Sequence, residues 1–300
     1  MTKVAIVTDS CASIPEAMLT ELDIHWVPYY IHCGDEILRD LITIQRQTFY
    51  NWLPTAAELP QTASPGPGDY LALYEQLAHN ADVQAIVSIH MTSKGSGAYQ
   101  AAKAAQSMLA ESMPKLRIEV IDSLNVAMAH GWMVIEAARA ALQGQSLGAI
   151  TQLVKEMIPI TRMIQTADTL KYLHMGGRIG KAKHLVGSLL NIKPLISMEN
   201  GTIVTLGQAR SRTRAYQMIV DKIESIVGFR GKIKIAYLHA AAQKEALRIK
   251  EMVENRLTCV ESLLAELSPA LGVHTGPGTA GVCYYPVDGL KLPAAINRQE

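Results

Sequence analysis

Short apolar runs alternate with longer amphipathic segments along the first half of the chain. The run at residues 4–7 ends in Thr8, Asp9 and Ser10, as expected where a buried parallel strand meets a helix cap. The same alternation continues to residue 143. Strands are expected at residues 24–31, 84–89 and 117–121, and helices at residues 14–22, 70–78, 97–109 and 126–143. This order predicts a doubly wound, mostly parallel sheet.

After a helix expected at residues 147–157 the pattern changes, which places a domain boundary near residue 160. The dipeptide Asn200-Gly201 favours a tight hairpin between two antiparallel strands. The later elements are expected to be strands at 193–198, 202–206, 232–238, 262–267 and 281–285, and helices at 213–227 and 243–256. We therefore predict an α/β protein of two domains. Residues 1–160 form a Rossmann-like parallel-sheet domain, and residues 161–300 a smaller α+β domain.

Size and composition agree with a packed two-domain protein. Three hundred residues exceed the usual size of a single hydrophobic core, and 49% of them are hydrophobic. The formal net charge is +1 and aromatic residues make up only 5% of the chain. Because neither a basic field nor basic runs with stacking residues are present, nucleic acid is not an expected partner.

The chain starts directly in a strand pattern, without a signal-like segment, and no apolar stretch is long enough to span a bilayer. We expect a cytoplasmic protein with no integral membrane segment. Four scattered cysteines contain no Cys-x-x-Cys pair, so free thiols are favoured over a disulfide or a metal site.

Two polar segments that follow expected strands are candidates for ligand binding. Residues 62–69 offer Thr62 and Ser64 as hydroxyl donors, although a surface loop with a helix cap is the favoured interpretation of this segment taken alone. Residues 90–97 precede the expected helix at Gly97, where backbone amides and hydroxyls could bind an anion. The hydroxyl residues there are Thr92, Ser93 and Ser96. Capping of the helix by Ser93 or Ser96 is the alternative.

Two further segments lie in the second half. Residues 176–180 contain Arg178, and Arg210 follows downstream; arginine suits an oxyanion, although basic residues are commonly solvated surface charges. The segment at 272–278 is expected to be a rigid loop that points His274 and Thr275 into a cleft, although an isolated histidine is more often structural.

A catalytic function lacks a recognisable motif. The sequence has no Gly-x-Ser-x-Gly elbow, no His-Glu-x-x-His pair and no nucleotide fingerprint. The four polar segments also provide no clear nucleophile, base and orienting group. Binding is therefore favoured over turnover.

Taken together and in this order, the segments closely resemble the DegV family of fatty-acid-binding proteins. The most specific motifs are Gly-Gly-Arg-Ile at residues 176–179, Asn-Ile-Lys-Pro at 191–194 and His-Thr-Gly-Pro-Gly at 274–278. The resemblance implies the DegV/EDD fold, with a Rossmann-like domain of the kind shared with dihydroxyacetone kinases. It also implies a long-chain fatty acid such as palmitate, stearate or oleate between the two domains, with an acyl tunnel in the C-terminal domain and no cofactor or metal.

The resemblance further assigns residues to roles. The carboxylate would be bound by Thr62, Ser93, His274 and Thr275, with Ser64, Thr92, Ser96 and Gly97 in the neighbouring loops. A separate fatty acid kinase would phosphorylate the carboxylate with the help of Arg178 and Arg210, and contact with membranes would be transient. The chain itself is expected to be a carrier and not an enzyme. The alternatives are a small-molecule kinase or phosphotransferase related to dihydroxyacetone kinase, and a lipid sensor.

Overall fold

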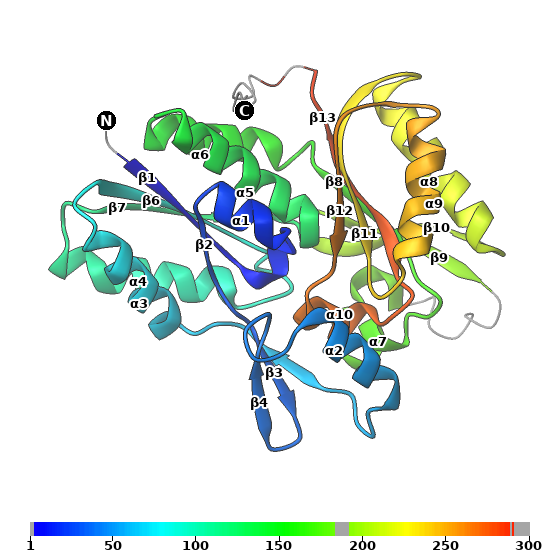
Figure 1. Ribbon diagram of the computed structural model, residues 1–300, viewed down its shortest axis with the longest axis horizontal. Coiled ribbons are helices and arrows are strands. Elements are labelled where there is room, and N and C mark those ends of the chain that lie inside the picture. The colour runs from blue at the N-terminus through cyan, green and yellow to red at the C-terminus, as the bar shows by residue number, and fades with distance from the viewer. Residues whose placement is uncertain (1–2, 184–191, 289, 291–300) are drawn as a thin grey trace.

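The computed structural model describes residues 3–183, 192–288 and 290. Strands within these residues form three sheets, and helices cover the two larger ones (Figure 1). The predicted α/β class, with a parallel sheet in the first half of the chain, is confirmed. The predicted boundary near residue 160 remains a prediction.

The first sheet has four parallel strands in the order β2-β1-β6-β7. Its strands are β1 (Lys3–Asp9), β2 (Ile24–Val27), β6 (Val83–His90) and β7 (Arg117–Asp122). The helices of this half are α1 (Glu16–Glu21), α3 (Pro67–Ala78), α4 (Ala98–Ser112), α5 (Ala127–Leu142) and α6 (Leu147–Met157). Helix α6 has the bounds that the sequence predicted, 147–157. The other helices named here differ from their predicted bounds by a few residues at their ends.

The single strand expected at residues 24–31 is wrong. The chain leaves the parallel sheet after Val27, and Pro28, which has no backbone N–H, cannot continue a ladder. Residues that follow form β3 (Tyr30–Cys33), which pairs in an antiparallel sheet of order β4-β3-β5. The partners are β4 (Glu36–Arg39) and β5 (Gln61–Ala63). Thr62, expected in a loop, therefore lies on a strand.

The third sheet is mixed and has the order β10-β9-β8-β13-β11-β12. Its strands are β8 (Arg162–Thr166), β9 (Lys193–Glu199), β10 (Thr202–Ala209), β11 (Lys232–His239), β12 (Thr258–Glu266) and β13 (Ala280–Pro286). The helices α8 (Arg212–Val227) and α9 (Gln243–Glu254) pack on this sheet. The hairpin predicted at Asn200-Gly201 is confirmed, and both residues have positive φ, of 47° and 79°.

Short helices complete the chain, and one of them corrects the sequence prediction. They are η1 (Ser10–Ala12), α2 (Arg46–Trp52), η2 (Leu53–Thr55), α7 (Lys171–Met175) and α10 (Pro269–Thr275). The rigid loop predicted at residues 272–278 is helical as far as Thr275. Ser268 caps this helix by accepting a hydrogen bond from Leu271 N, and Pro269 suits its first position.

Helix α5 joins the two larger sheets, since it contacts β1 and β6 on one side and β8 and β13 on the other (Figure 1). Thirteen of its sixteen residues are buried. Trp132 Nε1 donates to the Cys283 carbonyl oxygen at 3.0 Å. Glu136 Oε1 accepts from Lys234 Nζ at 2.8 Å and from the Tyr285 hydroxyl at 2.9 Å. Both sheets thus share one core and one buried polar network.

Three further observations concern the described residues. No helix among them is long and apolar enough to cross a membrane. No group of three or more His, Cys, Asp or Glu side chains there could bind a metal ion. All four cysteines are free, with Cys11 and Cys283 buried and Cys33 and Cys259 partly exposed.

We expect Glu136→Gln to destabilise the protein by about 3 kcal/mol, because it leaves the partly buried cations Arg139 and Lys234 with Glu261 as their only carboxylate partner. Urea denaturation of both proteins measures the change. Glu119→Gln, at an exposed position of β7, is the matched control. Equal midpoints for wild type and Glu136→Gln would show that the network contributes nothing to stability.

Candidate ligand-binding site

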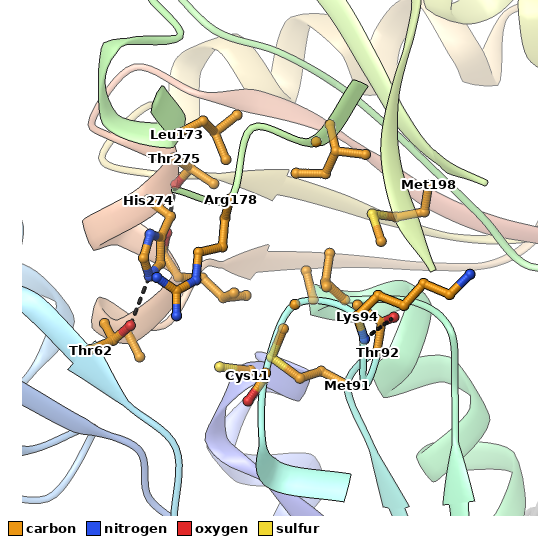
Figure 2. A pocket seen from close by; sticks show the side chains of 18 of the residues that line it. Cys11, Thr62, Met91, Thr92, Lys94, Leu173, Arg178, Met198, His274 and Thr275 are labelled. Carbon is orange, nitrogen blue, oxygen red and sulfur yellow. Dashed lines mark hydrogen bonds between the residues drawn. The ribbon is translucent and has the colours of Figure 1, made fainter. Parts of the chain in front are cut away.

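A cavity of about 240 Å³ lies between the parallel and the mixed sheets (Figure 2). Most of its wall is apolar and comes from both halves of the chain, including three methionines with flexible side chains. The apolar wall consists of Cys11, Met91, Val126, Ala127, Met163, Leu173, Met198, Ile203, Leu267, Ala270 and Leu271.

The polar part of the wall carries hydroxyls and positive charge. Its side chains are Tyr29, Thr62, Ser64, Thr92, Lys94, Ser96, Gln165, Arg178, Thr202, His274 and Thr275. Among the residues that the structure describes, no aspartate or glutamate lines the cavity, whereas Arg178 and Lys94 are cations. A wall of this chemistry suits a molecule that is largely apolar and has one anionic group.

Thr62 and His274 meet at one side of the cavity, although 212 positions separate them in the sequence. Thr62 Oγ1 lies 2.8 Å from His274 Nε2, and Arg178 lies beside the imidazole (Figure 2). Strand β5 supplies Thr62, and the last turn of α10 supplies His274. Helix α10 reaches β5 because Gly272 packs against α2: a Cβ there would lie 2.7 Å from the Tyr50 hydroxyl.

The hydrogen bonding of His274 identifies its tautomer. Nδ1 is buried without a hydrogen-bond partner, and a Cβ at Gly176 would lie only 2.2 Å from it. A buried N–H without an acceptor costs more than a buried lone pair without a donor. The proton therefore resides on Nε2, which donates to Thr62 Oγ1. The Thr62 hydroxyl hydrogen is then free to point at a ligand.

The charge state of His274 follows from its surroundings. Burial, together with the smaller effect of the positive charge of Arg178, lowers the pKa of His274 to about 4. The imidazole is consequently neutral at physiological pH, when the cavity is empty. Arg178 and Lys94 are then the positive charges on the wall.

Two serines add hydroxyls near Thr62. Ser96 Oγ lies 2.5 Å from the Tyr29 hydroxyl and accepts a hydrogen bond from Ala98 N at the start of α4. Ser64 lies beside this loop, because a Cβ at Gly97 would be 3.0 Å from Ser64 Oγ. Ser96 therefore lines the cavity and contacts the first residue of α4, whereas the N-cap of this helix is Gly97 and has no side-chain cap.

The structure places the other predicted residues differently. Ser93 is not a lining residue, and its backbone N–H donates to Asp122 Oδ1 at 3.2 Å. Thr92 and Thr275 line the cavity but donate their hydroxyl hydrogens to the carbonyl oxygens of Gly201 and Leu271. Arg210 is exposed and lies outside the lining.

Arg178 is exposed at the boundary between the cavity and a second, outer pocket of about 510 Å³. Thr62, Arg178 and His274 line both spaces. Arg178 NH1 donates to the Gly176 carbonyl oxygen at 2.7 Å, which holds the side chain over its own glycine loop. The outer pocket therefore lies against the Thr62–His274 side of the cavity.

A hydrogen-bonded Ser88–His90–Asp9 chain was missed by sequence reasoning. Ser88 Oγ lies 2.7 Å from His90 Nε2, and His90 Nδ1 lies 3.1 Å from Asp9 Oδ2. Burial would raise the pKa of Asp9, but His130 and His90 outweigh it and lower that pKa. The Ser–His–Asp order of this chain resembles a catalytic triad. However, Ser88 and His90 are fully buried, and none of the three residues lines the cavity. We interpret the chain as structural, since Asp9 also accepts from the backbone N–H groups of Cys11 and Met91.

Comparisons with known proteins agree with this architecture. The family model described as "Uncharacterised protein, DegV family" matches residues 3–287. A DegV domain-containing protein of Caldanaerobacter subterraneus is 31% identical over 284 residues, which are 95% of this chain and 99% of the relative. This chain therefore belongs to the DegV family.

Two solved structures show how closely the fold agrees. One is a DegV family protein from Thermus thermophilus, whose structure is described as showing fatty acid binding. It has a TM-score of 0.87 and 27% identity, and the match covers 95% of this chain and all of that one. DegV of Bacillus subtilis, described as a fatty acid binding protein, has a TM-score of 0.84 and 30% identity at the same coverage. The family and fold implied by the sequence resemblance are thus confirmed.

The low pKa of His274 predicts a pH dependence of stability. Because the unfolded state binds a proton near pH 6.5 and the folded state only near pH 4, stability falls as pH decreases between these values. The loss from this group is up to about 3 kcal/mol. Chemical denaturation between pH 4 and 7.5 should show a shallower loss for His274→Gln, whereas His79→Gln, at an exposed site, keeps the wild-type slope. Parallel curves for all three proteins would contradict the prediction.

Proposed function

We propose that this chain binds one long-chain fatty acid in the cavity, with the carboxylate near Thr62 and His274 and the acyl chain along the apolar wall. The observation that carries the proposal is the wall itself, to which the described residues contribute hydroxyl donors and two cations but no carboxylate. Of these cations, Lys94 already donates to the Asn200 carbonyl oxygen. The fatty acid binding described for the Thermus thermophilus and Bacillus subtilis relatives supports it.

The energetics of such a ligand divide between its two ends. Burial of an alkyl chain contributes roughly 0.8 kcal/mol per methylene, so the apolar wall supplies most of the affinity. The carboxylate loses its hydration and needs hydrogen bonds in return. Thr62, whose hydroxyl hydrogen is free, and Ser96 and Ser64 nearby are the donors we assign to it. The neutral imidazole of His274 orients Thr62.

Substitution of Thr62 and Ser96, with the neighbouring Ser93 as a control, tests the assignment of the carboxylate donors. We expect Thr62→Val and Ser96→Ala to weaken fatty acid binding by about 1–3 kcal/mol each, because each removes a hydroxyl from the head-group side. Ser93→Ala is the matched control in the same loop and should bind as wild type does. Delipidated protein is titrated with oleate by isothermal calorimetry, after mass spectrometry of the purified protein has identified the acid it carries.

The two sets of outcomes separate distinct errors. If neither native mass spectrometry nor titration detects a fatty acid, the proposed function is wrong. The acid could instead bind with an affinity that Ser93→Ala lowers and Ser96→Ala leaves unchanged. The head group is then bound by the Ser93 side of the loop, as the family resemblance implied.

We further propose that the protein is a carrier that presents the carboxylate to a separate fatty acid kinase. The position of the outer pocket against the Thr62–His274 side supports this, because a phosphoryl donor held by a partner could approach there. A carboxylate oxygen would attack the terminal phosphorus of a nucleoside triphosphate, forming an acyl phosphate and releasing the diphosphate. Exposed Arg178 would stabilise the charge on the transferred group.

Substitution of Arg178 tests its part in this transfer. With a fatty acid kinase and loaded carrier, Arg178→Ala should lower the rate of acyl phosphate formation by about tenfold or more. Arg210→Ala, outside the cavity lining, should have a smaller effect. Both variants are compared when fully loaded with oleate, so that loss of a wall cation does not enter the measured rate. A rate unchanged by Arg178→Ala would remove Arg178 from the mechanism.

The alternative functions give different results in the same assay. Nucleotide turnover by the isolated chain would favour a small-molecule kinase or phosphotransferase. A loaded protein that no kinase can use, but that binds a regulatory partner only when loaded, would favour a lipid sensor. The buried Ser88–His90–Asp9 chain supports neither, because it does not reach the cavity.

A further inference from the structure

The start of α10 is bound by residues from the first fifty positions of the chain. Ser268 N donates to Ser13 Oγ at 3.1 Å, and Ala270 N donates to Asp40 Oδ1 at 3.2 Å. The strand end just before it is held as well. Arg46 Nε donates to the Glu266 carbonyl oxygen and the Tyr50 hydroxyl donates to that of Leu267. Helix α10 is therefore anchored at its start by one part of the fold, while its end carries His274.

Asp40 is unusual among these anchors because it is a fully buried carboxyl. Its Oδ2 has no hydrogen-bond partner among the described residues. Burial raises the pKa of Asp40 to about 6, although the nearby hydroxyl of Ser10, the N–H of Ala270, the hydroxyl of Ser268 and the charge of Arg46 offset part of this effect. Ionised Asp40 is thus costly at neutral pH, and a geometric role would explain its presence.

The backbone around Asp40 is also constrained. Leu41, the next residue, has a φ of 61°, a region that a leucine rarely occupies. Asp40 N donates to the carbonyl oxygen of Tyr29, whose side chain lines the cavity and contacts Ser96. The turn after β4 therefore touches the cavity wall at Tyr29 and the start of α10 at Ala270.

We propose that Asp40 is a positioning residue of the head-group site. Ala270 and His274 are four residues apart, which is about one helical turn. Because α10 has only seven residues, a shift at Ala270 is transmitted to the imidazole and changes its 2.8 Å contact with Thr62. Asp40 thereby fixes the direction of the Thr62 hydroxyl without contacting the ligand. This inference rests on the proposed binding of a fatty acid carboxylate.

The experiment compares oleate with its methyl ester, which has the same chain but no ionised head group. Asp40→Ala removes the acceptor for Ala270 N, and Asp40→Ser leaves an acceptor oxygen one bond closer to the backbone, beyond the 3.2 Å contact. We therefore expect the ratio of acid to ester affinity to fall about tenfold in both variants. Asp40→Asn retains an oxygen in the Oδ1 position and should restore the ratio. If Asp40 only stabilised the fold, all three variants would keep the wild-type ratio of acid to ester affinity.

Ile249→Ala is the control for general destabilisation, since Ile249 is buried in the core under α9 and outside the cavity lining. It should leave the ratio unchanged. If Asp40→Ala and Asp40→Ser both retain the wild-type ratio, Asp40 has no positioning role. If wild-type protein binds neither oleate nor its ester, the proposed function itself is wrong. This outcome differs from failure of the positioning role alone, in which oleate still binds.

A second readout needs no ligand and applies to whichever variants fold. Imidazole ¹⁵N spectra of the ligand-free protein report the tautomer of His274, and the signal is assigned with His274→Gln. The signal should shift in Asp40→Ala and Asp40→Ser and stay in place in Asp40→Asn. An identical His274 signal in all of them would overturn the proposal.

Discussion

An ionised head group can leave water only where fixed donors replace its hydration, and for the proposed ligand that requirement falls on the side of the cavity where Thr62 meets His274. Thr62 and His274 come from opposite ends of the chain, yet their side chains lie 2.8 Å apart. The glycines beside them make this possible, since Gly176 gives the imidazole room and Gly272 lets α10 approach α2. The proposed carboxylate site depends on this close packing.

The rest of the fold keeps that contact in place. Helix α5 fixes the two larger sheets against each other through a common core and through the Glu136 network. The hairpin of β9 and β10 adds a second link, because the hydroxyl of Thr92 and the amine of Lys94 donate to the carbonyl oxygens of Gly201 and Asn200. The cavity is therefore enclosed by elements tied to each other, and its apolar wall is available for a buried alkyl chain.

Buried polar groups in this protein have separate tasks. The Ser88–His90–Asp9 chain satisfies donors and acceptors beneath the sheet and holds the backbone at Cys11 and Met91, which line the cavity. Asp40 instead holds the start of α10. Neither group lines the cavity. Polar groups that support the cavity wall from behind are thus distinct from polar groups that line it.

The sequence alone determined the alternation of strands and helices, the hairpin at Asn200-Gly201 and the family, because apolar periodicity, turn chemistry and linear motifs are local properties. It also indicated Thr62, Arg178, His274 and Thr275, which line the cavity. Tertiary structure decided the pairing of β3 with β5, the helical form of α10 and the choice between Ser93 and Ser96 for the cavity wall. Each of these depends on partners distant in sequence, such as Asp40 for α10, Asp122 for Ser93 and Tyr29 for Ser96. Local pattern cannot reveal such partners, because only packing brings them within hydrogen-bond distance.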